Sequence, residues 1–171
     1  MELVIRDETS ADVAAIHAIN EAVFETDAEA RLVNALRHNG RLRVSLVAIK
    51  DGDLVGHISF SPITVTGLDG SVVDGIGLGP VAVQTSHQGY GIGSRLVQAG
   101  LDRVRAAGSS FCVVLGHPEF YPRFGFERAS LFGIRWERDV PEAVFFVLEL
   151  TSGALLGVSG VVRYAPEFAI V

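Results

Sequence analysis

Three glycines at alternate positions, Gly89, Gly91 and Gly93, interrupt an otherwise regular stretch of the chain. The apolar residues 81–83 before them favour a strand, and the pattern after them favours a helix. Glycine permits positive φ and lets another molecule approach the main chain closely. Because the first N–H groups of a helix have no partner within it, such a loop can bind an anion such as a phosphate. The alternative is a tight strand-to-helix turn that binds nothing.

Two common phosphate-binding motifs do not fit this loop. A Walker loop ends in Gly-Lys followed by Ser or Thr, whereas the chain has Gly93, Ser94 and Arg95 at that point. A dinucleotide-binding loop has its third glycine one position later and belongs to a βαβ unit that opens with a strand. A bound phosphate would therefore need a different type of glycine loop.

The elements before the loop are predicted from periodicity and turn residues. Residues 3–6 indicate a first strand, and two helices follow. The second helix is expected to open with a capping box at Thr26–Glu29 and to end at Gly40. Residues 44–65 predict a β-hairpin that turns at Asp-Gly.

The elements around and after the loop complete an α/β pattern. Residues 71–83 predict a long strand that glycines and a proline interrupt, which is typical of a bulge or of a closely bound ligand. A helix follows the loop, and the apolar run 111–115 predicts a buried parallel strand. A strand over 144–150 and a hairpin-like tail close the chain. We therefore expect one α/β domain over residues 1–171, with a mixed sheet and helices on both faces.

Composition narrows the partners. The net charge is −6, from 14 basic and 20 acidic residues, and no basic stripe typical of nucleic-acid binding is present. No apolar run reaches the roughly 20 residues of a membrane span, and the start of the chain has no signal-peptide pattern. The single Cys112 excludes an internal disulfide and a multi-cysteine metal site. We expect a cytoplasmic protein without nucleic-acid or membrane partners, in which an anionic ligand is held locally.

Two motifs resemble those of the GNAT superfamily of acetyl-CoA-dependent N-acyltransferases. Gln88–Gly93 looks like the family signature Gln/Arg-x-x-Gly-x-Gly/Ala, and Tyr121 stands four residues before a Gly-Phe pair, as in many members. The Pro-Arg-Phe-Gly-Phe form of 122–126 and the tail Gly160–Tyr164 are similar to a YhbS-like bacterial branch. The resemblance covers nearly the whole chain. It implies the GNAT fold, an α/β fold whose mostly antiparallel central sheet contains a splayed strand pair.

The resemblance also implies a cofactor site. In this family the loop amides hold the pyrophosphate of coenzyme A, and an open strand edge pairs with the pantetheine amides. Acetyl-CoA is then the co-substrate, no metal is needed, and the N–H of Val83 would polarise the thioester carbonyl. By position, the cofactor-binding residues are Val81, Ala82, Val83, Gln88, Gly89, Tyr90, Gly91, Ile92, Gly93 and Ser94.

Tyr121 is the candidate catalytic residue that the resemblance implies. It would give a proton to the departing coenzyme A thiolate, and the alternative is a tyrosine packed among neighbouring phenylalanines. Pro122 disfavours the α region for Tyr121, whereas many relatives hold this tyrosine in a regular helix. The base that takes the proton of the amine stays open between Asp74, Glu119, His117 and water.

Two other reactive side chains are interpreted as core residues. His57 lies among apolar neighbours of a predicted strand, where a histidine with satisfied hydrogen bonds is the simpler interpretation. Cys112 belongs to the buried run 111–115 and has no cationic neighbour in the sequence that would favour its thiolate.

The resulting prediction is an N-acetyltransferase. It would transfer an acetyl group from acetyl-CoA to the amine of a small molecule or of a protein, by direct attack in a ternary complex. The alternative from another class is a non-catalytic acyl-CoA-binding sensor or interaction module on the same fold. The chain is expected to act as a monomer or a homodimer.

Overall fold

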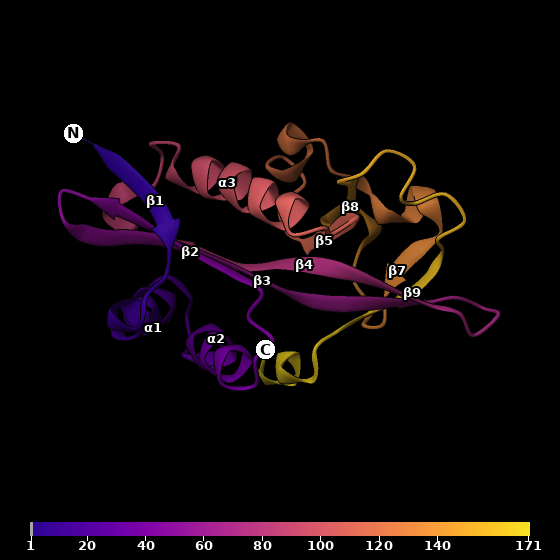
Figure 1. Cartoon of the computed structure of the whole chain (residues 1–171), viewed down its shortest axis with the longest axis horizontal. Coiled ribbons are helices and arrows are strands. Elements are labelled where there is room, and N and C mark those ends of the chain that lie inside the picture. The colour runs from indigo at the N-terminus through magenta and orange to yellow at the C-terminus, as the bar shows by residue number, and fades with distance from the viewer. Residues whose placement is uncertain (1) are drawn as a thin grey trace. The chain divides into compact units, whose positions relative to one another are not determined.

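The computed structural model of the chain describes residues 2–171 (Figure 1). These residues form two compact units, one made of 2–61, 79–103 and 166–171, the other of 62–78 and 104–165. Three elements run from one unit into the other, namely β3 (Asp53–Thr66), β4 (Val72–Val83) and α3 (Ile92–Ala106).

The first unit is built on antiparallel strands. β1 (Leu3–Asp7) pairs with β2 (Val44–Lys50), and β2 pairs with the first part of β3. The predicted hairpin is confirmed, because Asp51 and Gly52 have φ angles of 52° and 83° between β2 and β3. Two successive positive φ angles give the turn whose twist matches that of the flanking strands.

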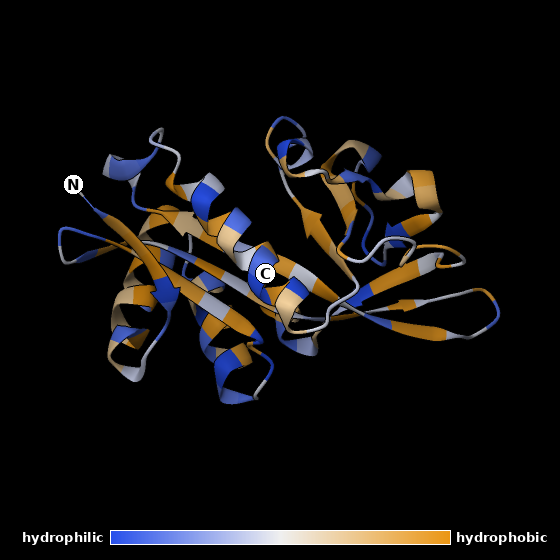
Figure 2. Ribbon diagram, turned by 45° about the horizontal axis from the view of Figure 1, so that its top comes forward, coloured by the Kyte–Doolittle hydropathy of each residue, from blue (hydrophilic) through white to orange (hydrophobic). Residues whose placement is uncertain are grey.

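Helices cover both faces of these strands (Figure 1). Ile16 and Val33, from the first two helices, pack against Val47 of β2 on one face. The long helix lies on the other face, where the Cβ position of Gly56 faces Ile92. Figure 2 shows polar and apolar patches alternating along the helices, as expected of helices with one buried face. The helical segments of this unit are η1 (Ser10–Asp12), α1 (Val13–Val23), α2 (Ala28–His38), η2 (Thr85–His87), the greater part of α3, and η6 (Pro166–Ile170).

The capping box predicted at Thr26–Glu29 is wrong. α2 has Asp27 as its N-cap, and the Asp27 side chain makes no capping hydrogen bond. A capping box forms instead before the first helical segment, where a carboxylate oxygen of Asp12 accepts the N–H of Thr9 at 2.7 Å and its hydroxyl at 3.1 Å. Aspartate reaches back as glutamate does in the usual motif, so the S/T-x-x-E/Q pattern alone selected the wrong site.

The second unit contains the remaining strands. The parallel pairing of β4 with β5 covers Ile76–Leu78, and β5 pairs on its other side with antiparallel β8, which also pairs with β6. Apolar residues of β3, β5 and β8 form the core of this unit, with Phe111 and Val113 fully buried. The elements are β5 (Phe111–Leu115), η3 (Tyr121–Phe124), β6 (Glu127–Arg128), η4 (Ala129–Phe132), β7 (Ile134–Trp136), η5 (Glu142–Val144), β8 (Phe145–Glu149) and β9 (Gly160–Tyr164).

The hairpin-like tail predicted after the strand at 144–150 is wrong. β9 pairs antiparallel with β3 and parallel with the short strand β7, so the final strand does not return along β8. The sequence missed β7 because three residues are too few for strand alternation to be recognised.

The predicted fold class is confirmed. The sheet is mixed and mostly antiparallel, since only the pairs β4–β5 and β7–β9 are parallel among the strands of residues 2–171. Across the same residues, no helix combines the length and apolar character that crossing a bilayer would require.

Candidate functional site

The glycine loop joins the short turn η2 to helix α3 in the first unit (Figure 1). Gly89 and Gly91 have φ angles of +84° and +81°, values that residues with a side chain rarely adopt. A Cβ atom added to either glycine would meet no protein atom within 4 Å. These glycines are therefore required by the backbone conformation, and they leave the space beside the loop open to a ligand.

The main-chain donors of this loop are available. Among residues 2–171, the N–H groups of Gly91, Ile92, Gly93 and Ser94 donate to no protein acceptor, whereas the N–H of Arg95 donates to Gly91 O at 3.1 Å. The N–H groups that precede this first hydrogen bond of α3 are therefore free, and they lie at the positive end of the helix dipole. This arrangement can bind a diphosphate without any basic motif in the sequence.

The side chain of Gln88 is engaged within the loop itself. Its amide nitrogen donates to the main-chain oxygen of Val83 at 3.0 Å. The resemblance to the GNAT superfamily implied that both Gln88 and Val83 bind the cofactor. The hydrogen bond between them closes the loop onto the end of β4 and uses one acceptor position of that carbonyl.

The end of β4 has one edge directed away from β3. The N–H of Gln84 donates to Val55 O in β3 at 2.8 Å. Because successive residues of a strand direct their N–H and C=O groups to opposite edges, those of Val81 and Val83 face the other edge. Ala82 is buried between these two valines. The end of β4 therefore presents main-chain N–H and C=O groups along an open edge, and an extended ligand that contains amides could pair with them as a neighbouring strand does.

Lys50, which sequence reasoning overlooked, lies beside the loop. Its Nζ is 5.6 Å from the ring centroid of Tyr90, an exposed residue between the two glycines with positive φ. Lys50 is the only lysine of the chain and ends strand β2. Only the fold brings it to Tyr90, and no local sequence pattern marks it. The protein is acidic overall, so this cation supplies local positive charge next to the free amides.

Tyr121, in the second unit, begins the 3₁₀ turn η3 and is buried within an aromatic cluster. Its ring makes edge contacts with Phe120 and Phe126, at centroid distances of 5.0 and 5.7 Å. A Cβ on Gly116 would come within 2.2 Å of the ring, so the glycine makes room for the tyrosine. Burial raises the pKa of the Tyr121 phenol to about 12. The expected departure from a regular helix is present, and Tyr121 is both packed and protonated.

The candidate bases, Asp74, Glu119 and His117, lie in the second unit as well, and all three are exposed. The main-chain oxygen of His117 accepts the N–H groups of Phe120 and Tyr121, at 3.1 and 3.4 Å. His117 therefore initiates the turn that carries Tyr121, and nothing in its surroundings distinguishes it as a base.

His57 and Cys112 are core residues, as predicted. Neither has exposed surface. His57 Nε2 lies 2.8 Å from Ser45 Oγ, and His57 Nδ1 lies 3.3 Å from Asn20 Nδ2, so both ring nitrogens have partners. Burial raises the pKa of the Cys112 thiol far above its ordinary value. Neither side chain is available to a substrate in the residues that the structure describes.

Comparison with known proteins places the chain in a family. A family model for the acetyltransferase (GNAT) domain matches residues 4–129. The chain is 40% identical over 167 residues to the uncharacterized N-acetyltransferase YhbS of Escherichia coli (strain K12). This match covers 97% of this chain and 98% of the relative.

Two solved structures are similar over nearly the whole chain. One is the GNAT family N-acetyltransferase YhbS from Escherichia coli in complex with CoA, with a TM-score of 0.92, 38% identity and coverage of 99% of this chain and 93% of that chain. The other is a GNAT family acetyltransferase from Brucella melitensis in complex with acetyl-CoA, with a TM-score of 0.79, 35% identity and 98% coverage of both chains. The motifs, the fold and these relatives agree, and the chain belongs to the GNAT family of acetyltransferases.

Proposed function

We propose that this acetyltransferase transfers the acetyl group of acetyl-CoA to an amine, of a small molecule or of a protein, by direct attack in a ternary complex. The observation that carries the proposal is the set of free N–H groups at residues 91–94, next to two open glycines with positive φ. Such donors at a helix N-terminus suit the pyrophosphate of coenzyme A. The CoA and acetyl-CoA complexes of the two similar proteins support the same co-substrate.

Each cofactor-binding residue is assigned a role from its main-chain groups, its side-chain hydrogen bond or its burial. The amides of Gly89–Ser94 bind the pyrophosphate, and Gln88 fixes the loop through its bond to Val83. The free edge at Val81 and Val83 pairs with the pantetheine amides, while Ala82 anchors the strand in the core. The N–H of Val83 would polarise the thioester carbonyl.

The chemistry requires two proton transfers. The amine nitrogen attacks the carbonyl carbon, the C–S bond breaks, and an amide and a coenzyme A thiolate form. Tyr121 gives its phenolic proton to the thiolate, and a base or water takes one proton from the amine. An amine with an ordinary lysine pKa is neutral in only about one molecule in two thousand at pH 7, so removal of its proton limits the reaction unless a base assists.

The proposal includes the domain organisation and the cellular location of the protein. The 171 residues act as one domain, since three elements continue from one compact unit into the other. The protein works in the cytoplasm, with which its single, free and buried cysteine is compatible.

The cofactor site is tested by thermal unfolding with acetyl-CoA. At about 100 times its Kd, a ligand adds about 2.7 kcal/mol, which raises the Tm of a chain of this size by roughly 5–10 °C. Gly91→Glu should abolish this rise, because it places a carboxylate where the diphosphate binds. Gly108→Glu is the matched control, since Gly108 also has positive φ (+95°) and open space around its Cβ position.

Release of free coenzyme A with a panel of amines tests the transfer itself. Amine-dependent thiol release by the unmodified chain, lost in Gly91→Glu, supports the proposal. An unchanged rise in Tm for Gly91→Glu contradicts the assigned loop. Binding of acetyl-CoA without transfer to any amine favours the non-catalytic acyl-CoA sensor instead.

A further inference from the structure

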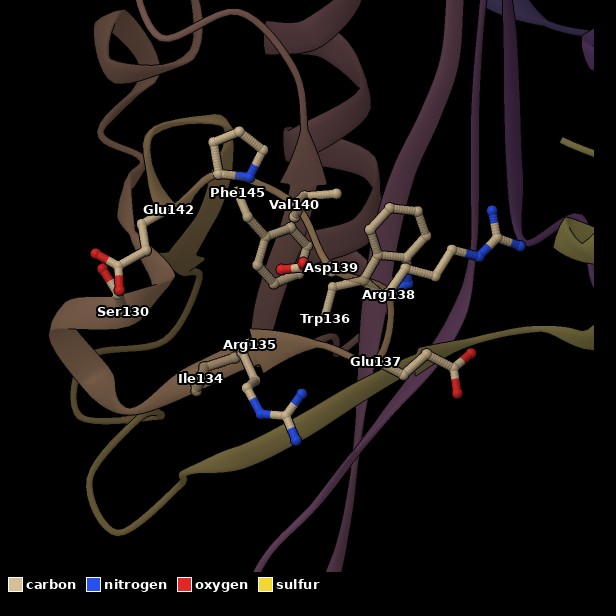
Figure 3. A pocket seen from close by; sticks show the side chains of 11 residues that line it. Ser130, Ile134, Arg135, Trp136, Glu137, Arg138, Asp139, Val140, Glu142 and Phe145 are labelled. Atoms are coloured by element: carbon tan, nitrogen blue, oxygen red, sulfur yellow. The ribbon is translucent and has the colours of Figure 1, made fainter.

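A second concave site lies wholly within the second unit, between β7 and the start of β8. It is a pocket of about 400 Å³ (Figure 3). None of the residues assigned to the cofactor or to proton transfer lines it. Its lining comes from one continuous segment, residues 130–145. Pockets of this size accommodate small organic ligands.

The floor and wall of the pocket are apolar. Trp136 and Phe145 stack with ring centroids 6.4 Å apart and planes 17° from parallel. Ile134 and Phe145 are buried beneath the pocket, and Val140 is half-buried at its side. This surface suits a methylene chain more than a polar group.

The pocket already accommodates one cation. The guanidinium carbon of Arg138 lies 4.9 Å from the ring centroid of Trp136, within the range of a cation–π contact. Another charged lining residue, Glu137, is paired with Arg163 at 3.3 Å. The aromatic floor is thus compatible with positive charge, and the charge of Glu137 is neutralised by its partner.

Two carboxylates on the rim have no partner. Neither Asp139 nor Glu142 makes a hydrogen bond or an ion pair within residues 2–171, and both are exposed. In Figure 3 the Asp139 carboxylate lies among the lining side chains, whereas the guanidinium of Arg135 extends away from them. With Glu137 paired to Arg163 and Arg135 directed away, the charges left at the pocket are those of Arg138, Asp139 and Glu142, and their sum is −1.

We propose that this pocket binds an alkylammonium ligand, with its ammonium group at Asp139 and Glu142 and its methylene chain on the apolar surface of Phe145 and Val140. A short alkyl diamine has the required chemistry. The inference depends on the pocket alone, and it holds or fails independently of the acetyl transfer proposed above.

Fluorescence of Trp136 tests the proposal directly, because the chain has a single tryptophan and it lies in the pocket. Titration with 1,5-diaminopentane should give a saturable change in Trp136 emission that weakens as salt is added. The uncharged 1,5-pentanediol, which has the same chain length, should give none. Asp139→Asn and Glu142→Gln should each raise the apparent Kd about two- to fivefold, the effect of removing one member of an exposed charge pair.

Glu127→Gln is the matched control, since Glu127 is exposed, belongs to the same unit and lies outside the pocket. Its Kd should equal that of the unmodified chain. The proposal is overturned by the absence of a saturable change, by an equal response to the diol, or by an equal loss of affinity in Glu127→Gln. Tighter binding of glutarate than of the diamine also overturns it, because the pocket would then select anions through its arginines.

Discussion

Tyr121 is 5% exposed, and its hydroxyl, although it makes no hydrogen bond among residues 2–171, is not one of the fully buried polar atoms that lack a partner. The cluster of Phe120 and Phe126 fixes the ring without using its polar end. Burial raises the pKa of Tyr121 to about 12, so the free protein keeps this proton well beyond pH 9. The rate between pH 6 and 9 will therefore follow other groups, and Tyr121 must be tested by substitution.

Tyr121→Phe should lower kcat by about two orders of magnitude, the lower end of the range for a lost general acid, and should leave the affinity for acetyl-CoA nearly unchanged. The measurement is steady-state transfer to a fixed amine, together with acetyl-CoA titration. With an acetyl thioester of a more acidic thiol, the difference between the two proteins should narrow, because that thiolate departs without protonation.

Tyr164→Phe is the control, since Tyr164 is a partly buried tyrosine of the second unit and burial raises its pKa too. It should keep normal turnover. Equal turnover in Tyr121→Phe and the unmodified protein would exclude Tyr121 from proton transfer.

Single residues were predictable where their neighbours along the chain determine their surroundings. The apolar run around Cys112 and the apolar neighbours of His57 were enough to place both in the core. The bond from Gln88 to Val83 was not predictable, because it depends on how tightly the loop folds back on the strand. The Lys50–Tyr90 contact joins residues 40 positions apart, and only the fold brings them together.

At the scale of elements, a helix and a β-hairpin border the glycine loop. Helix α3 provides the free amides, and the β2–β3 hairpin brings the end of β2 to the exposed ring of Tyr90. An anion at the loop would therefore meet a helix terminus and a cation together. Their combined field compensates for the negative net charge of the whole chain.

Lys50→Gln should raise the Kd for acetyl-CoA about two- to fivefold, with a shallower dependence on salt, because a partly exposed cation near phosphate is lost. Lys50→Arg should restore most of the affinity, since it keeps the charge. Calorimetric titration at two salt concentrations measures both effects. Identical salt dependence in Lys50→Gln and the unmodified chain would show that Lys50 does not contact the cofactor's phosphates.

Elements with strong periodicity or clear end signals were predictable, and short ones were not. The hairpin at Asp51-Gly52 and the strand Phe111–Leu115 followed from turn chemistry and from a continuous apolar run. β7 and β9 could not be placed, because the pairing of a three-residue strand depends on tertiary contacts. The capping box was misplaced because Thr26 accepts the N–H of Ala28 and not that of Glu29, whereas Asp12, which the usual motif does not include, accepts the N–H of Thr9.

At the scale of the whole molecule, a buried polar network affects stability. The Ser45 hydroxyl donates to Glu8, which also receives the Arg37 Nε–H at 2.7 Å. Because Ser45 has a single hydroxyl proton, His57 Nε2 donates to Ser45 and Nδ1 accepts from Asn20, so the ring is neutral. Burial lowers the pKa of His57 to about 4, with the nearby Glu8 opposing this shift and Arg37 adding to it. Although burial alone would raise the pKa of Glu8, hydrogen bonds from Arg37 and Ser45 lower it.

Stability should therefore fall as the pH decreases from about 6.5 to 4. In this interval the unfolded chain protonates His57 and the folded chain does not, which costs about 2 kcal/mol by pH 5 and about 3 kcal/mol by pH 4. The lowered pKa of Glu8 acts in the same direction, because its ionised form is the one stabilised by folding. Urea unfolding at pH 7, 6, 5 and 4 measures the effect, and His57→Gln should flatten the dependence.

If His57→Gln does not fold, NMR of the histidine rings in the unmodified protein provides the second test. The His57 ring should remain neutral at pH 5.5. Protonation of that ring near pH 6.5, or a free energy of unfolding that does not change between pH 7 and 5, would contradict the assignment.

The complete burial of Cys112 determines which assays can be used with this protein. The only sulfhydryl of the polypeptide is sealed inside the β-sheet and held in its unreactive, protonated form. Disulfide-exchange dyes and alkylating agents should leave the native enzyme untouched. Every thiol that such a dye detects during turnover will then have come from the spent cofactor, so the acetyl acceptors can be sought by continuous colorimetry without mutating the protein.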